Sequence, residues 1–249
     1  MGANTNHDSF AQPPDKNCLV WRYLDLAKYL DLLTSRTLFL STVGCLPDHF
    51  EGSITHINDQ ATREYINSIV DMSPEVKDRA LQNLSNSQKD SRSRININCW
   101  HMSEFESEAM WKLYGKHADA VAIRTRYSTL VNCLPESTSI GLVNYIDYKT
   151  DYIPGGNLLT PYMYKRMSFE HEKEVRVLYW QAPTLEIPLP LIKEDGGIRI
   201  PVYLDLLIED IYVAPSCPKW QLRLIKLITT KFLPSKTVHQ SSLQDPAIF

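Results

Sequence analysis

The stretch LVWRYLDLAKYLDLLTSRTLFLST, residues 19–42, sets the fold class of this chain. It opens with a short apolar segment at 19–23 that is typical of a strand. Asp25 then stands where the N-cap of a helix is expected, and apolar residues follow it at helical spacing. The segment TLFLST, residues 37–42, alternates and is β-branched at both ends, which indicates a second strand. A strand, a helix and a strand in such quick succession predict a fold that mixes helices with a sheet.

The rest of the chain repeats this alternation of short strands and helices. Strands are expected at ININCWH, DAVAIRT and GLVNYIDY and at several later segments, and helical patterns lie between many of them. A length of 249 residues is enough to bury the core of one large domain. We therefore expect a single α+β domain over residues 19–249, with a mixed, mostly antiparallel sheet core and flanking helices.

Two parts of the chain are expected to lie outside that core. Residues 1–18 are predicted to be a disordered N-terminal tail. Residues 59–94, approximately, are predicted to be a helical insertion of two helices, because the second opens with Ser73-Pro74-Glu75 and proline suits a first helical turn. Within it, SNSQKDSRSR (85–94) has no apolar residue and is predicted to be a mobile loop.

Composition and charge narrow the class of protein. The chain is 43% hydrophobic and 22% charged, with a net charge of −3, so it lacks the positive excess of a nucleic-acid-binding protein. It has no run of about 18 apolar residues, and its N-terminus lacks the charged-then-apolar order of a signal peptide. The five cysteines are widely spaced and contain no CxxC pair, which favours reduced core residues. A cytoplasmic location without a membrane partner is expected.

The short motifs of several enzyme classes are missing. The sequence has no GxGxxG, no GxxxxGK[ST] and no GxSxG, so Rossmann, P-loop and α/β-hydrolase interpretations lose their usual support. The seven histidines are isolated, and none pairs with another at a spacing that metal sites use. We expect no metal centre.

The segment SFEHEKEVRVLYW, residues 168–180, places three glutamates directly before a predicted strand. Because alternate side chains of a strand share a face, one side is expected to present Glu172, Glu174 and Arg176 above Leu178 and Trp180. The simpler interpretation is a surface face with a screened ion pair, worth about 0–1 kcal/mol. The functional interpretation is a cleft with carboxylates at its lip, able to act as a general base or to stabilise a cationic sugar. The sequence predicts that Glu170, beyond this face, is solvated.

Two further segments offer candidate site residues. The helix SEAMWKLYG carries Trp111 and Tyr114, which are either core residues or the walls of an aromatic pocket. The turn PDHFEGS, residues 47–53, places Glu51 on a loop directly after a predicted strand, where sites often gather.

These landmarks, taken in chain order, resemble a largely bacterial domain-of-unknown-function family, number two-nine-seven-one. That family carries a Tyr/Arg-bearing first strand, an Asp-Pro-Phe-Glu-Gly turn, a Met-Trp helix and a Lys…Glu-x-Glu-x-Arg strand. In this chain His49 replaces the proline of the turn. The resemblance covers about Leu19 to Trp180, and the family name implies no function. The matching residues are Met110-Trp111, Lys165 and Glu172-x-Glu174-x-Arg176.

A second resemblance is to ADP-ribosyltransferases, which carry in chain order an Arg or His on a first strand, a Ser-Thr strand and a Glu-x-Glu before a later strand. The resemblance implies an enzyme that cleaves NAD at the nicotinamide–ribose bond, with Glu174 polarising the ribose and Glu172 serving the acceptor. The gap from the Ser-Thr strand to Glu172 is long, which departs from the pattern. The residues expected to hold NAD are Arg22, Tyr23, Ser41, Thr42, Glu51, Trp111, Tyr114 and Arg176.

Three functions therefore stay open. The first is the NAD-dependent transferase, in a toxin or phage-defence setting, with an unspecified acceptor macromolecule. The second is a non-catalytic domain that recognises a nucleotide or peptide. The third is a carboxylate-based hydrolase that uses Asp48, Glu51 and the Glu172/Glu174 pair, with or without a metal. The first requires Arg22, Ser41 and Glu174 to face one bound NAD.

Overall fold

The computed structural model describes residues 2–115, 119–182 and 191–248. Its main element is a ten-stranded sheet with the order β12-β11-β4-β1-β3-β2-β10-β9, in which β8 also pairs with β3 and β5 with β8. The pairings are antiparallel except β11 with β12, which confirms a mixed, mostly antiparallel sheet. The strands of this sheet are β1 (Leu19–Leu24), β2 (Thr37–Thr42), β3 (Ile95–Met102), β4 (Val121–Arg126), β5 (Ser139–Leu142), β8 (Glu174–Trp180), β9 (Ile192–Glu194), β10 (Gly197–Pro201), β11 (Asp210–Val213) and β12 (Val238–Gln240).

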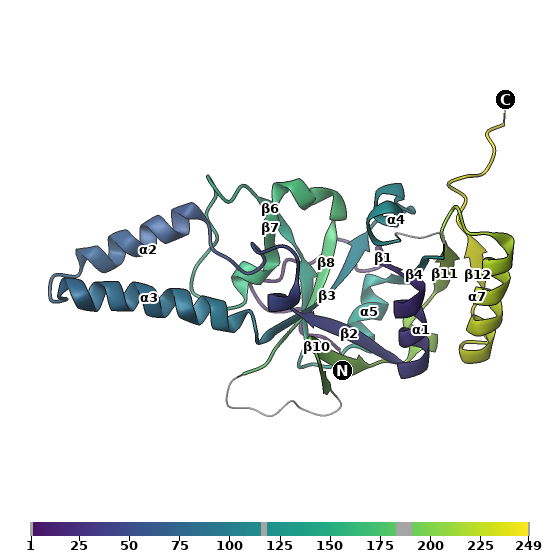
Figure 1. Cartoon of the computed structure of the whole chain (residues 1–249), viewed down its shortest axis with the longest axis horizontal. Coiled ribbons are helices and arrows are strands. Elements are labelled where there is room, and N and C mark those ends of the chain that lie inside the picture. The colour runs from purple at the N-terminus through teal and green to yellow at the C-terminus, as the bar shows by residue number, and fades with distance from the viewer. Residues whose placement is uncertain (1, 116–118, 183–190, 249) are drawn as a thin grey trace.

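Helices flank this sheet, and a short parallel pair lies beside it (Figure 1), so the α+β class expected from the sequence is confirmed. The parallel pair is β6 (Asn144–Ile146) with β7 (Tyr164–Arg166). The α-helices are α1 (Leu26–Ser35), α2 (His56–Ser68), α3 (Pro74–Ser91), α4 (Glu108–Tyr114), α5 (Tyr127–Cys133), α6 (Leu204–Leu207) and α7 (Lys219–Phe232). The 3₁₀ turns are η1 (Val43–Cys45), η2 (Thr160–Met163) and η3 (Met167–Glu172).

The sheet divides at β3. One edge of β3 pairs with β8 along its length, from Ile95↔Trp180 to His101↔Glu174. The other edge pairs with β2 only near Ile97 and with β1 only near His101. Since a strand has two hydrogen-bonding edges, β1 and β2 share one edge of β3 and diverge between these two contacts. This divergence leaves the backbone of β3 around Cys99 open to a side chain.

The two faces of the sheet are covered differently. The larger core lies under α1, α5 and α7 and includes Val175, Val177 and Trp100 from the central strands. On the opposite face Ile97 and Leu178 pack against η2, and a separate cluster forms around α4. This alternation along β8 follows from the period of two of a strand. It confirms the expectation that Glu174, Arg176 and Leu178 share a face.

Helices α2 and α3 form a hairpin that projects away from the sheet at one end of the molecule (Figure 1). Both lie within or next to the insertion expected at 59–94, and Thr55 rather than an acidic residue caps α2. The prediction of a mobile loop at 85–94 is wrong for most of its length, because α3 continues to Ser91. A polar sequence is compatible with helix here since the hairpin is mostly exposed and needs little apolar surface.

The N-terminal segment is not the disordered tail that the sequence suggested. It has little regular secondary structure, but Ala3 and Phe10 are buried and Asn4 forms a bridge with Ser139 of β5. The Gln12 amide donates to the Ile140 carbonyl at 2.7 Å. Two apolar side chains and an edge strand in need of hydrogen bonds are enough to hold the segment against the sheet. Among the described residues, no helix has the length and apolar character that crossing a membrane requires.

Candidate functional site

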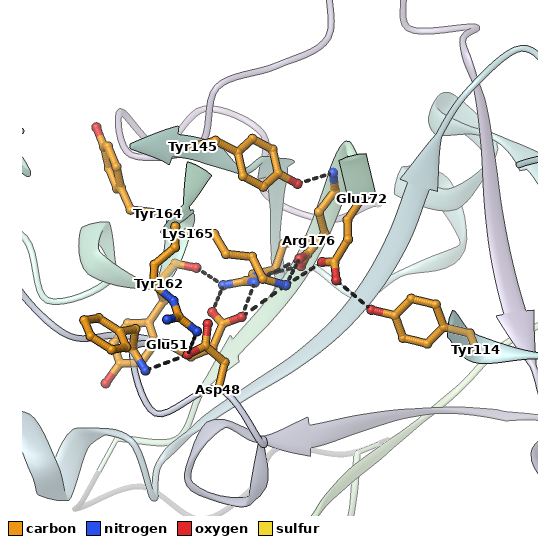
Figure 2. Close-up of polar contacts among 12 residues, drawn as sticks. Asp48, Glu51, Tyr114, Tyr145, Tyr162, Tyr164, Lys165, Glu172 and Arg176 are labelled. Carbon is orange, nitrogen blue, oxygen red and sulfur yellow. Dashed lines mark hydrogen bonds and ion pairs between the residues drawn. The ribbon is translucent and has the colours of Figure 1, made fainter. Parts of the chain in front are cut away.

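The main candidate site is a network of five buried charged side chains, which we call the ion network: Glu51, Lys165, Glu172, Glu174 and Arg176 (Figure 2). Arg176 lies at its centre, and its side chain is fully buried. Its guanidinium donates to Glu174 at 2.6 and 3.0 Å and to Glu51 at 2.8 and 3.2 Å. The Tyr162 carbonyl accepts a further hydrogen bond from it at 2.5 Å. All five N–H groups of an arginine are thereby used, with both carboxylates held in bidentate geometry.

Lys165 on β7 joins the third carboxylate to the network. Its Nζ lies 2.5 Å from Glu172 Oε2, 3.3 Å from Glu174 Oε2 and 3.4 Å from Glu51 Oε1. Burial alone would lower the pKa of Lys165, but the carboxylates outweigh it and raise that pKa. Lys165 therefore remains a cation at the point where the three carboxylates converge.

Glu172 is the network carboxylate closest to the surface. Its side chain is 9% exposed, against 3% for Glu174 and 4% for Glu51. The hydroxyl of Tyr114, itself 44% exposed, donates to Glu172 Oε1 at 3.0 Å. This pair joins the C-terminal end of α4 to η3.

Glu172 does not belong to the strand in which the sequence placed it. Strand β8 begins at Glu174, Glu172 ends η3, and Lys173 between them has a left-handed backbone with φ 39°. This turn directs Glu172 toward Lys165, whereas Glu174 follows the alternation of β8. The two glutamates therefore reach the same lysine by different local structures.

Glu174 is held ionised by its neighbours. Burial alone would raise the pKa of this carboxyl, but Arg176 and Lys165 lower it to about 2. Burial together with the charge of Glu174 raises the pKa of the Cys99 thiol well above its ordinary value. Glu174 thus carries its charge throughout the physiological range, and Cys99 stays a neutral thiol.

The pKa of Glu174 predicts a pH dependence of stability. Because the pKa is lower in the folded state, the stabilisation is complete above the unfolded value of about 4.3 and is lost as the pH falls toward about 2. A shift of this size corresponds to about 3 kcal/mol. Urea unfolding of the wild type and of Glu174→Gln at several pH values checks this. Between pH 5 and pH 2, the free energy of unfolding should fall less for the variant than for the wild type. Parallel curves for the two proteins would contradict the assignment.

Glu51 reaches the network from the turn that follows η1. The backbone N–H of Glu51 donates to the Asp48 carbonyl, and that of Ser53 to the Phe50 carbonyl. Gly52, between them, has φ 73°. A Cβ on Gly52 would collide with the ring of Tyr162. The glycine therefore permits both the turn and the close approach to Tyr162, whose carbonyl binds Arg176.

Replacing Gly52 should destabilise the protein more than a change of backbone preference alone explains. Gly52→Ala combines an unfavourable φ with a collision against a buried ring, and we expect a loss of about 2–4 kcal/mol in the free energy of unfolding. Gly156→Ala is the matched control, since Gly156 has φ 95° but no atom within 4 Å of its added Cβ. Chemical denaturation of both variants measures the difference. Equal losses would show that the contact with Tyr162 contributes nothing.

Arg22 lies beside the network but is not part of it. Register places Trp21 in line with His101 and Glu174, so Arg22 leaves β1 on the opposite face of the sheet. Its Nη1 donates to the Cys99 carbonyl at 2.8 Å, in the opening between β1 and β2. Burial lowers the pKa of Arg22. Within the described ranges no carboxylate forms an ion pair with it, which leaves most of its N–H groups without a protein acceptor.

Ser41 and Thr42 lie away from the network. Ser41 pairs with Ile97, which pairs with Leu178, so Ser41 shares the face of Glu174. Ser41 lies two strands away from β8, and its position in the register is four residues from Glu174. About 16 Å therefore separates the Cα atoms of Ser41 and Glu174. Thr42 donates to Asn96 Oδ1 at 2.9 Å and lines a different cavity of about 450 Å³, near the turn before β10. The structure does not bring these two residues together with Glu172 and Glu174.

Tyr23 and Trp111 belong to a packed cluster, not to an open pocket. They are 6% and 4% exposed, and their rings meet edge to face at 4.9 Å. The Tyr23 hydroxyl accepts from the Ser107 N–H, and the Trp111 Nε1 donates to Glu106. Both residues therefore pack between α4 and the sheet, and only Tyr114 of the predicted aromatic walls reaches the network.

Two network contacts were absent from the sequence-based set of site residues. Lys165 appeared only as a match to the family pattern, although an isolated lysine before a Glu-x-Glu was a usable signal. The hydroxyl of Tyr145 on β6 accepts the backbone N–H of Glu174 at 2.8 Å, and nothing in the local sequence marked it. Lys165 and Tyr145 meet Glu51, Tyr114 and the motif Glu172-x-Glu174-x-Arg176 at one place (Figure 2). Segments that carry the family resemblance thus come together in the structure.

The charge of the network determines its chemistry. Three carboxylates and two cations leave one negative charge among the five side chains. In the part of the chain that the structure describes, no group of three or more His, Cys, Asp or Glu side chains is arranged to hold a metal ion. At the convergence of Glu51, Glu172 and Glu174 the ammonium of Lys165 takes the position that a cation would need. The arrangement is suited to stabilising positive charge that develops near Glu172.

Comparisons with models of known protein families, with curated protein sequences and with solved structures return no match. The two resemblances drawn from the sequence therefore stay predictions, and the functional argument rests on the geometry of the network.

Proposed function

We propose that the chain cleaves NAD at the bond between nicotinamide and ribose, with Glu172 as the carboxylate that faces the ribose. The observation that supports this most is the position of Glu172. It is the most exposed carboxylate of a network with one net negative charge, and it accepts a hydrogen bond from the hydroxyl of Tyr114, a residue that is 44% exposed. The other four side chains of the ion network hold Glu172 in place from its buried side.

The chemistry of the reaction explains why such a site is suitable. When the bond from ribose C1′ to the nicotinamide nitrogen breaks, its electron pair leaves with nicotinamide and the sugar gains oxocarbenium character. A fixed carboxylate stabilises that charge without having to reorganise during the reaction. An acceptor nucleophile then forms the new bond to C1′, and its proton passes to a base. Glu172 is positioned to be that base because it is the most exposed of the three network carboxylates.

This proposal drops the requirement that Ser41 face the bound NAD, because Ser41 lies about 16 Å from Glu174, and it changes the roles of other residues. Glu174 is paired with Arg176 and Lys165 and is 3% exposed, so it acts as a positioning residue behind Glu172. Tyr114 supplies the aromatic surface for the nicotinamide ring. The unused N–H groups of Arg22 suit an anionic part of NAD. The proposal leaves the acceptor open and includes consumption of NAD in a toxin or phage-defence setting.

A direct assay tests the proposal. The purified chain is incubated with NAD, alone and with a cell lysate as a source of acceptors, and released nicotinamide is measured by chromatography. We expect release above the rate of a heat-denatured sample in at least one condition. No release in either condition would contradict the proposal.

The second candidate is a non-catalytic recognition domain. It is favoured by a specific observation: all three network carboxylates already accept hydrogen bonds or ion pairs from internal donors. Such a domain would bind NAD or a related nucleotide and leave it intact. Binding by calorimetry without nicotinamide release would therefore favour recognition over catalysis.

A further inference from the structure

A cavity of about 430 Å³ lies at the base of the helical hairpin, away from the lip formed by Glu172 and Tyr114. Its walls come from α2, from the end of α3, from the segment 152–162 and from Gly52 and Ile54. Asn58 of α2 fixes this segment, because its amide donates to the Ile153 carbonyl at 2.8 Å and accepts from the Ile153 N–H at 2.9 Å. This wall of the cavity is therefore attached to the hairpin by a pair of hydrogen bonds. The volume of the cavity is in the range of small-molecule sites.

The lining of this cavity is uncharged. None of the residues around it is Asp, Glu, Lys, Arg or His. Two tyrosines line it, Tyr65 of α2 and Tyr152, and these residues are 70% and 55% exposed. The lining thus offers aromatic surface without a counter-charge, which is unsuitable for binding a phosphate or carboxylate inside the cavity and suitable for a neutral flat ring.

One amide in the lining has unused hydrogen-bonding capacity. Among the described residues the side chain of Gln88 donates and accepts no hydrogen bond, whereas its backbone carbonyl accepts from Ser91. A free carboxamide presents one donor and one acceptor in a plane. That pair is complementary to an adenine edge, where an exocyclic N–H group stands next to a ring nitrogen acceptor.

We propose that this cavity binds an adenine ring, with the Gln88 amide pairing to the edge of the base and Tyr65 and Tyr152 contacting its faces. The base can belong to a free nucleotide or to a nucleic acid strand, and the site recognises the same ring in both. The inference does not depend on NAD cleavage at Glu172, because adenosine alone contains every group that the cavity would recognise.

Isothermal titration calorimetry with adenosine tests the proposal. We expect saturable one-to-one binding to the wild-type chain. N6,N6-dimethyladenosine, which has no N–H at that position, should bind at least about tenfold more weakly because its hydrogen bond to the half-buried Gln88 amide is lost. A single-stranded oligoadenylate identifies the source: tighter, salt-sensitive binding indicates a strand, and equal affinity indicates a free nucleotide.

Two variants connect the binding to the cavity. Gln88→Leu removes both the donor and the acceptor at similar volume and should weaken adenosine binding at least about tenfold. Gln82→Leu, an exposed position on the same helix outside the cavity, should bind like the wild type. Absence of adenosine binding at about 1 mM, or equal affinity in wild type and Gln88→Leu, would overturn the proposal. Nicotinamide release by a chain that fails to bind adenosine would leave the proposed function standing and this site refuted.

Discussion

Replacing Glu172 by glutamine should reduce nicotinamide release from NAD by about 10²–10³-fold. The glutamine keeps the volume of the side chain, and its amide oxygen still accepts from Lys165, so the fold should persist. The negative charge that faces the ribose is lost, and with it the stabilisation of the cationic transition state. Initial rates at saturating NAD, together with thermal unfolding of both proteins, measure the two effects separately.

Glu170→Gln is the matched control for this variant. Glu170 is exposed, lies two residues earlier in η3, and makes no side-chain hydrogen bond or ion pair within the described ranges. We expect its rate of nicotinamide release to equal that of the wild type. Similar rates for Glu172→Gln and the wild type, with both folded, would show that Glu172 does not face the reacting bond.

Replacing Arg176 by methionine should have the largest effect on stability. The variant leaves Glu51 and Glu174 buried with only the shared ammonium of Lys165 to compensate them. Removing one partner of a buried ion pair costs about 3–5 kcal/mol, because the remaining charge stays desolvated. Denaturant unfolding of the wild type and the variant measures this loss. Restoration by the double change Glu174→Gln with Arg176→Met would identify the unpaired carboxylate as its cause.

Arg36→Met provides the control for Arg176. Arg36 pairs with Asp205 at 3.0 Å, but both side chains are about half exposed, so the pair contributes no more than about 1 kcal/mol. A loss below about 1 kcal/mol for Arg176→Met as well would mean that the ion network does not stabilise the fold.

The sequence was most informative where structure is local. Asp25 caps α1 by accepting from the Lys28 N–H, as expected from its position before an apolar helical pattern. Period-two alternation correctly placed Glu174, Arg176 and Leu178 on one face of β8. These features depend on near neighbours in the chain, and so the residue pattern is sufficient to predict them.

The site itself depends on long-range geometry that no local pattern contains. Glu51 meets Arg176 across 125 residues of sequence. The left-handed Lys173 turns Glu172 away from the strand, and a lysine gives no signal of that conformation. Arg22 leaves β1 on the face opposite Glu174, but because β1 and β2 diverge along one edge of β3, its guanidinium reaches the Cys99 carbonyl through the opening, where the charge of Glu174 acts on it. The order and register of the strands decide which face of the sheet a side chain reaches.

The most direct test of the account is a crystal structure of the chain with a non-cleavable NAD analogue. We predict that the nicotinamide ribose lies within about 2.6–3.2 Å of a Glu172 carboxylate oxygen, with the nicotinamide ring against Tyr114 and Glu174 still paired to Arg176. An analogue bound near Ser41 and Thr42 instead, with Glu172 still enclosed by Lys165 and Tyr114, would contradict it.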